Sequence, residues 1–406
     1  MAEETLLFEG LKVLDVGSWI AGPVAGTMLA DRGAEVIKVE VPVMGDGYRH
    51  YAILPFTANA DVNYTWALDA RNKRSIALNL KTEEGMRVLE KLIAWCDVYI
   101  TNQPLPLRRQ LKLEYEDIKH LNERMIYSSL TPYGEQGPDS DNEAFDLVAY
   151  WNRSGLMNKM RHDGIEPVQA MAGMGDHPTA VAFYASIVTA LYQRERTGKG
   201  CKAYTSLLAN GVWSASCLAQ ATFAGADFSP MQHPQRMTAA LYGTRDDRWI
   251  QINMVRSSEA IDQMLVAMEA FELLADERLS TLEGRMEHPD EFTARLREVF
   301  ATKTADEWVQ ILKVDNKLPI EKVATFEDLL TDPHLKLNGM VAPPIEDVGI
   351  DYIINDPVNV EGVARIGAKK APELGEHTDE ILAEFGYDPE AIVALREKGV
   401  LQPLPE

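Results

Sequence analysis

An aspartate between glycines and a long apolar segment is the residue of this sequence best suited to covalent chemistry. Asp176 lies in the run Gly-Met-Gly-Asp-His-Pro of residues 173–178, and the segment that follows predicts a helix over 178–194. A carboxylate at a helix N-terminus is stabilised as the anion, and flanking glycines let a substrate carbonyl approach it closely. Asp176 can therefore be a covalent nucleophile. The structural alternative is an N-cap, a position that aspartate often occupies.

Three other polar features have both a chemical and a structural interpretation. His177 has no serine or cysteine near it in the sequence that would complete a triad, so a hydrogen-bonded structural role is favoured. The run Arg-Asn-Lys-Arg of residues 71–74 and the pair Arg108 and Arg109 are compact basic groups in an acidic chain. Arginine and lysine bind phosphate oxygens well, but such runs are as often solvated loops.

A glycine-containing turn over residues 17–26 occupies the place of a dinucleotide-binding loop. Its glycines, Gly17, Gly22 and Gly26, do not have the G-x-G-x-x-G spacing, and Pro23 removes one amide donor that could bind a phosphate. We therefore do not expect the turn to bind NAD. It remains a candidate ligand site, because open sheets bind ligands beyond the carboxyl ends of their strands.

Alternating apolar runs and helical patterns position these residues. An apolar run over 11–16 ends before a glycine, a helix extends to about residue 32, and a second apolar run covers 35–40. Strand, helix and strand in this order form a βαβ unit with parallel strands. The pattern then repeats, with strands predicted over 75–80, 97–101, 125–130 and 201–205 and helices over 83–94, 115–122, 178–194 and 207–221. The sequence therefore predicts a doubly wound, Rossmann-like α/β sheet.

Changes in composition and in the predicted strands and helices divide the chain into three segments. Residues 1–230 carry the predicted sheet, and a polar, proline-containing stretch at about 228–237 predicts a boundary. Residues 238–325 predict a smaller α+β domain, with a strand at 249–254 and helices at 259–274, 290–301 and 304–312. Residues 326–406 return to strands and loops and end in helices over 378–385 and 389–398.

Composition excludes several classes of function. The 406 residues include 62 acidic and 40 basic side chains, and a net charge of −22 argues against binding nucleic acid or an anionic membrane surface. No run of 18 apolar residues predicts a transmembrane helix, and the acidic N-terminus does not resemble a signal peptide. Cys96, Cys201 and Cys217 lie far apart, which fits neither a disulfide framework nor a zinc site. The sequence predicts a cytoplasmic enzyme without a metal.

In their order and spacing, the sequence motifs resemble those of the family III CoA-transferases. The resemblance covers almost the whole chain. The matching segments are 11–23, 33–40, 72–75, 97–102, 133–134, 137–138, 145–146, 175–176, 197–200 and 375–380.

The resemblance implies a fold and a reaction. The fold would be a large α/β domain built from both chain ends, a smaller domain from the middle, and an interlocked homodimer. In the reaction, Asp176 would attack a donor acyl-CoA to give an aspartyl-acyl anhydride and then an aspartyl-CoA thioester, and an acceptor carboxylic acid would reverse these steps. Coenzyme A would take part as a substrate, with no permanently bound cofactor.

The resemblance also implies which residues contact CoA and the acyl group. The turn of residues 18–21 matches a substrate-lining segment, and several polar and basic residues fall where the family contacts the nucleotide and pantetheine. The full set is Ser18, Trp19, Ile20, Ala21, Lys38, Arg71, Arg74, Asn102, Arg108, Tyr133 and Gly175.

Two departures from relatives help to choose a branch of the family. The racemases of this superfamily use a histidine where this chain has Phe145, which cannot exchange a proton. Formyl-transferring members have a glutamine where this chain has Ile20. Residues 133–138 and 175–178 look most like the 2-hydroxyacid CoA-transferases, and the apolar pair Trp19-Ile20 suits an aryl or branched acyl group. The alternatives are an acyl-CoA racemase or isomerase on the same fold, and a non-catalytic CoA-binding protein in which Asp176 only caps a helix.

Overall fold

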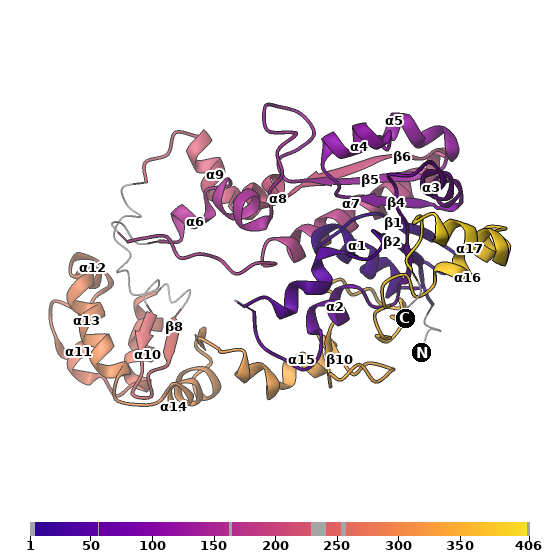
Figure 1. The fold of residues 1–406 in the computed structure, drawn as a ribbon. Coiled ribbons are helices and arrows are strands. Elements are labelled where there is room, and N and C mark those ends of the chain that lie inside the picture. The colour runs from indigo at the N-terminus through magenta and orange to yellow at the C-terminus, as the bar shows by residue number, and fades with distance from the viewer. Residues whose placement is uncertain (1–4, 56, 162–164, 229–240, 253–256, 404–406) are drawn as a thin grey trace. The chain divides into compact units, whose positions relative to one another are not determined.

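The computed structural model describes residues 5–55, 57–161, 165–228, 241–252 and 257–403. They form two compact units (Figure 1). The larger unit contains residues up to 161, 166–223 and those from His334 onward, so both chain ends belong to it. The smaller unit contains residues 224–333, together with the short stretch before residue 166.

Of the two boundaries predicted between the units, only the second can be compared with the structure. The predicted boundary at 230–238 lies within residues 229–240, outside the described part of the chain. The second boundary was predicted at 325–326, but the larger unit resumes at His334. The intervening residues stay with the smaller unit because Asp328 pairs with Arg248 at 2.6 Å and with Lys322 at 3.6 Å.

The larger unit is built on a six-stranded parallel sheet, which confirms the predicted α/β class. The strand order is β3-β2-β1-β4-β5-β6, the order of a doubly wound fold. Strands β2 and β3 lie on one side of β1, and strands β4 to β6 lie on the other side. In such a sheet a crevice is expected between β1 and β4, at the carboxyl ends of the strands. The strands are β1 (Lys12–Asp15), β2 (Glu35–Glu40), β3 (Arg74–Ala77), β4 (Val98–Thr101), β5 (Ile126–Thr131) and β6 (Cys201–Ser206).

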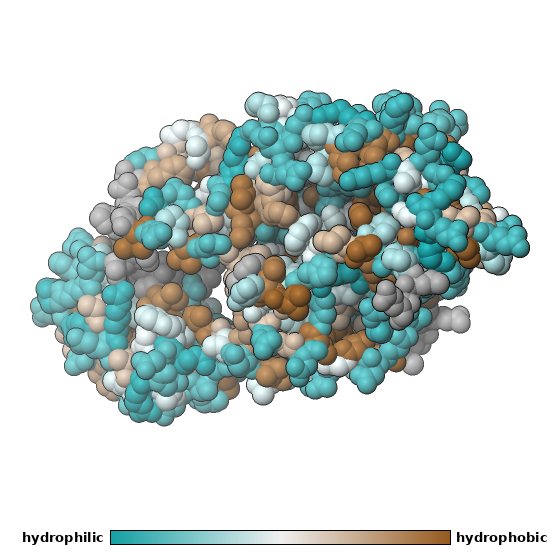
Figure 2. Space-filling view, viewed as in Figure 1, coloured by the Kyte–Doolittle hydropathy of each residue, from teal (hydrophilic) through white to brown (hydrophobic). Residues whose placement is uncertain are grey.

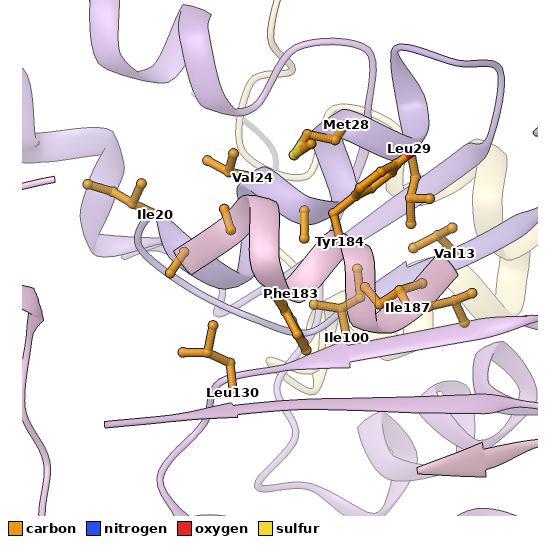
Figure 3. Close-up of a cluster of buried hydrophobic side chains, with 14 of the residues drawn as sticks. Val13, Ile20, Val24, Met28, Leu29, Ile100, Leu130, Phe183, Tyr184 and Ile187 are labelled. Carbon is orange, nitrogen blue, oxygen red and sulfur yellow. The ribbon is translucent and has the colours of Figure 1, made fainter. Parts of the chain in front are cut away.

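Alternate residues of the strands point into two separate cores. Val13 of β1 packs into the first core with helices α1 (Ala21–Ala30) and α7 (Asp176–Thr197), and the next residue, Leu14, packs into the second. Figure 3 shows side chains of α1 and α7 packed with Ile100 of β4 in the first core. The second core is closed by α3 (Glu83–Trp95), α16 (Thr378–Glu384) and α17 (Pro389–Glu397).

Shorter elements connect this framework. The predicted helix over 207–221 is divided at Ala215 into two helices. The connecting elements of the larger unit are η1 (Gly47–Ile53), α2 (Tyr64–Asp69), α4 (Leu105–Leu111), α5 (Tyr115–Ile118), η2 (Lys119–Leu121), η3 (Leu147–Asn152), α6 (Leu156–Lys159), α8 (Leu207–Ser214), α9 (Ser216–Phe223), α15 (Pro333–Leu337), β10 (Val341–Ala342) and β11 (Ile353–Ile354).

The smaller unit has a core of its own around an antiparallel sheet. Tyr242 stacks on Phe300, Trp308 meets Phe300 edge to face, and all three side chains are almost completely buried. Its elements are β7 (Leu241–Gly243), β8 (Trp249–Ile252), β9 (Ile320–Lys322), α10 (Ser258–Ala267), α11 (Phe271–Ala275), α12 (Leu282–Glu287), α13 (Pro289–Phe300), α14 (Ala305–Trp308), η6 (Val309–Asp315) and η7 (Glu327–Leu330).

The surface agrees with the composition. Hydrophilic residues dominate the face drawn in Figure 2, and hydrophobic residues are scattered among them. None of the helices in the described ranges is long and apolar enough to cross a membrane.

Candidate active site

A cavity of about 150 Å³ lies beyond the carboxyl ends of β1 and β4, where the strand order places a crevice. It brings together six of the residues predicted from the sequence, Ser18, Trp19, Ile20, Ala21, Asn102 and Asp176. The other lining residues are Gln103, Pro104, Leu105, Leu130, Thr131, Pro132, Ser140, Asn142, Glu143, Ala144, Phe145 and Leu207. Sequence reasoning singled out Phe145 and Thr131 only as positions where relatives have other residues, and it missed the rest of this second set, although the residues after β4 and β5 follow the same rule for strand ends as the turn after β1.

The turn after β1 is fixed by two polar side chains. Asn102 accepts a hydrogen bond from Ser18 N at 2.8 Å and donates one to Ser18 O at 2.7 Å. Trp19 N donates to Asp46 at 2.9 Å, and Trp19 has a φ of 64°. A left-handed conformation is costly for a bulky residue, so these contacts hold the turn in a strained shape. Trp19 meets Phe145 edge to face at 5.1 Å, and both side chains line the cavity.

Asp176 does not cap helix α7. The N-cap is Gly175, and no side chain caps the helix. Among the described residues, no hydrogen bond or ion pair involves the Asp176 carboxylate, which is partly buried in the cavity wall. Burial raises the pKa of Asp176 to about 7, and the nearby carboxylates of Asp146 and Asp69 act in the same direction. The N-cap interpretation is therefore wrong, and the side chain is left without a hydrogen-bonding partner in the described part of the chain.

The loop before Asp176 is held by the buried carboxylate of Asp146. One oxygen accepts hydrogen bonds from Gly173 N at 2.8 Å and Gly175 N at 3.0 Å, and the other accepts from Leu147 N at 2.8 Å. Glycine is required at position 175, because a Cβ there would lie 2.7 Å from Cγ of Tyr150. These hydrogen bonds connect the Phe145-Asp146 segment to the glycine-aspartate segment of residues 175–176. The sequence does not reveal this connection.

His177 is bound on both sides of its ring. Nε2 lies 3.2 Å from Asp69 Oδ1, and Nδ1 lies 3.1 Å from Gly173 O. Burial opposes a charge on His177, but the hydrogen bond and negative charge of Asp69 outweigh it and raise the pKa of the imidazole to about 9. A positive charge therefore stands beside Asp176 at neutral pH.

Four predicted CoA contacts have basic side chains, and none of the four lines the cavity. Arg108 is buried and donates to Ser129 Oγ at 2.5 Å and Leu130 O at 3.0 Å, which braces the end of β5. Arg71 forms a forked pair with Asp31, and Arg74 pairs with glutamates of β2 and α16. Tyr133 lies beneath the guanidinium of Arg153 at 5.4 Å. The sequence showed these charges but not the carboxylates that neutralise them.

Lys38 lies in a buried ionic network below the turn. Its ammonium group pairs with Asp46 at 2.8 Å and donates to Gly17 O at 3.0 Å, and Lys73 pairs with Asp15 at 2.9 Å alongside. Lys38 is 0% exposed. Since Asp46 also binds Trp19 N, Lys38 supports the shape of the turn from below.

Replacing Lys38 with methionine is expected to destabilise the larger unit by about 3–5 kcal/mol, because Asp46 would be left buried without its cation. Urea unfolding of Lys38→Met and of an exposed control, Lys81→Met, measures this difference. A direct contact of Lys38 with CoA would give the opposite pattern, a weaker CoA affinity with unchanged stability.

The cavity wall thus combines the Asp176 carboxylate, which has no hydrogen-bonding partner in the described part of the chain, with apolar side chains and polar loop residues that include Glu143. A carboxylate of this kind can attack a carbonyl group and hold an acyl group covalently. In the described ranges, no group of three or more His, Cys, Asp or Glu side chains is arranged to hold a metal ion.

Known proteins are similar in sequence to this chain over nearly its full length. The chain is 30% identical over 400 residues to an (R)-2-hydroxy-4-methylpentanoate CoA-transferase of Clostridioides difficile, with 98% of this chain and 100% of the relative covered. It is 30% identical over 408 residues to a cinnamoyl-CoA:phenyllactate CoA-transferase of Clostridium sporogenes, with 98% of each covered.

A solved structure and a family model agree with these relatives. A CAIB/BAIF family protein from Brucella suis matches the fold with a TM-score of 0.81 and 27% identity, over 94% of this chain and 100% of that one. The model of CoA-transferase family III matches residues 8–378. The resemblance seen in the sequence motifs is confirmed, and the chain belongs to CoA-transferase family III.

Proposed function

We propose that this enzyme moves CoA from a donor acyl-CoA to a 2-hydroxy, aryl or branched-chain carboxylic acid, with Asp176 as the covalent nucleophile. The observation that carries the proposal is the unpaired Asp176 carboxylate in the wall of a largely apolar cavity. Phe145 lines the same cavity and offers no acid or base for an α-proton, which favours CoA transfer over racemisation.

The reaction divides into steps that each exchange one acyl bond. An Asp176 oxygen attacks the thioester carbonyl of the donor, CoA leaves as the thiolate, and an aspartyl-acyl anhydride forms. The thiolate attacks the aspartyl carbonyl, which releases the donor acid and leaves an aspartyl-CoA thioester. The acceptor carboxylate then attacks this thioester and displaces the thiolate again. Attack of the thiolate on the new acyl group gives the product acyl-CoA and restores the Asp176 carboxylate.

The size and lining of the cavity support the proposed class of acid. A cavity of ~150 Å³ with apolar walls holds a ligand the size of benzene, and Trp19, Ile20 and Leu105 supply such walls here. The charged lining residues are Asp176 and Glu143, both acidic. A second carboxylate on the substrate would be repelled, so monocarboxylic acids fit better than dicarboxylic acids. The 2-hydroxyacid and phenyllactate relatives carry names that agree with this class.

The predicted CoA contacts fall into two groups in this proposal. The turn of residues 18–21, Asn102, Tyr133 and Gly175 contact the acyl and pantetheine part of the substrate. Lys38, Arg71, Arg74 and Arg108 act on CoA binding indirectly, by fixing the strands and turns that carry those contacts.

A homodimer is part of the same proposal. Trp213 of α8 and Phe223 of α9 are 78% and 81% exposed, and large exposed apolar side chains mark surfaces that another chain covers. Light scattering of the purified protein measures the expected mass of two chains.

Mass spectrometry of the enzyme incubated with acyl-CoA tests the proposal directly. Isocaproyl-CoA or cinnamoyl-CoA is expected to give a hydroxylamine-sensitive adduct on the peptide that contains Asp176, whereas succinyl-CoA is expected to give much less. No adduct, together with solvent deuterium entering the α-carbon, would identify an isomerase. Measurable CoA binding with neither signal from any acyl-CoA would identify a binding protein.

A further inference from the structure

We propose that His177 is a positioning residue, an imidazolium held by Asp69 and by the carbonyl of Gly173, that increases the ionised fraction of the neighbouring Asp176 near neutral pH. The inference deepens the function proposed above, in which Asp176 is the nucleophile. It assigns a charge and a purpose to a residue for which the sequence favoured only a structural role.

The geometry of the ring requires two protons. Nε2 faces the carboxylate of Asp69 and Nδ1 faces the carbonyl oxygen of Gly173, and a carbonyl oxygen only accepts hydrogen bonds. A neutral imidazole carries one N–H, so it can satisfy only one of these acceptors. The proton between the ring and Asp69 belongs on the ring, because imidazole is the stronger base.

Asp69 is built into the fold as a buried anion. It is 3% exposed, and its second carboxylate oxygen accepts a hydrogen bond from Tyr48 Oη at 2.7 Å. Burial and the charge of Asp69 raise the pKa of the Tyr48 phenol, so that it stays protonated and continues to donate. Thr27 Oγ1 donates to the Asp69 carbonyl at 2.5 Å and fixes the end of α2. A carboxylate held in this way needs a nearby cation, and His177 supplies it.

The groups that face Asp176 make this cation important. The carboxylates of Asp146 and Asp69 disfavour a negative charge at Asp176. The pKa values of the Tyr48 and Tyr51 phenols are raised, so these side chains stay neutral and supply no positive charge that would offset the repulsion. His177 opposes them, and it lowers the pKa of Asp176 below the value that burial and Asp146 would otherwise set. Removing the imidazolium would therefore leave a smaller fraction of the nucleophile ionised near pH 7.

The pH dependence of acylation separates this role from a structural one. In the wild-type enzyme the rate of adduct formation is expected to rise through a midpoint near 7, the pKa of Asp176. In His177→Gln the midpoint is expected to move up by about one pH unit, so that the rate falls ~10-fold at pH 6 and only ~2-fold at pH 8. Asp69→Asn is expected to shift the midpoint in the same direction but by less, because loss of the imidazolium is partly offset by loss of the Asp69 charge, which itself raises the pKa of Asp176. The exposed control His120→Gln leaves the profile unchanged. An equal loss at every pH, or an unshifted midpoint, would overturn the inference.

A second measurement does not depend on acyl transfer. With histidine labelled at 13Cε1, the full-length protein gives a His177 signal that is identified by its loss in His177→Gln. The ring is expected to titrate near pH 9 in the wild type and closer to the ordinary histidine value of about 6.5 in Asp69→Asn. Because coupling between two charges is reciprocal, Asp176→Asn is expected to lower the His177 midpoint by a similar amount, about one unit.

These readouts distinguish failure of the inference from failure of the proposed function. A neutral ring at pH 7.5, or a midpoint that ignores Asp176→Asn, contradicts the inference even if CoA transfer is active. A cationic ring that is coupled to Asp176, in a protein that forms no acyl adduct, supports the inference and rejects the proposed reaction.

Discussion

Replacing Asp176 with asparagine is expected to slow formation of the acyl-enzyme by ~10⁴-fold or more, because the amide cannot attack a thioester as the carboxylate does. The carboxylate has no hydrogen-bonding partner among the described residues, so the change removes the proposed nucleophile without breaking a hydrogen bond of the described fold. Single-turnover mixing with cinnamoyl-CoA, followed by mass spectrometry of the Asp176 peptide, measures the rate. The exposed control Asp61→Asn should keep the wild-type rate.

The stability of the same variant provides an independent check. Burial raises the pKa of Asp176 above its ordinary value to about 7, so the folded state holds the proton more tightly than the unfolded chain does. Ionised Asp176 therefore lowers the free energy of unfolding as pH rises from about 4 to above 7. Asp176→Asn should be more stable than the wild type at pH 8 and equal to it near pH 3. A variant that unfolds more easily at pH 8 would point to a structural role.

Removing the Asp146 side chain is expected to reduce kcat/KM by ~10²–10³-fold, because the loop that aims Asp176 would lose its anchor. In Asp146→Ala, the amides of Gly173 and Gly175 lose their common acceptor, and each unpaired buried N–H costs ~1–3 kcal/mol. Hydrogen exchange of the peptide spanning residues 170–176 measures the loosening directly. Unchanged exchange with a reduced rate would show that Asp146 acts on the reaction in another way.

The variant Asp146→Asn separates the anchor from the charge. Its remaining carbonyl oxygen can still accept from one of the loop amides, but the negative charge that raises the pKa of Asp176 is gone. The midpoint of the pH profile for acylation should therefore move below 7, opposite to the shift expected for His177→Gln.

Local patterns predicted most of the elements that build the larger unit. Strand β2 occupies residues 35–40 as its β-branched run indicates, and the parallel sheet follows from the alternation of strands and helices, although its strand order was not predicted. Helix α7 begins two residues before the predicted start, because Gly175 takes the capping position. Short elements such as α2 and η1 were missed, since helices of six or seven residues are too short to show a clear periodic signal.

The candidate site was predictable only in part. The turn after β1 and Asp176 come from local motifs, and the cavity brings them together with Asn102. The partners that decide what each charge does come from distant segments, as with Lys38 and Asp46 or His177 and Asp69. A sequence shows that a lysine is present but not that a carboxylate meets it in the folded chain. For this reason the basic residues were assigned to CoA, although their side chains brace the fold.

The larger unit depends on residues near the end of the chain, and this has a consequence for folding during synthesis. His377 N donates to Ser75 O of β3, and Asn79 N donates to Val400 O. The second core includes side chains of α16 and α17, whereas the core of the smaller unit lies entirely within residues 242–320. On the ribosome the smaller unit can therefore complete its core first. One face of the parallel sheet stays exposed until α16 and α17 have been synthesised. A message cut short before codon 377 would yield a chain with that apolar face exposed, prone to aggregation.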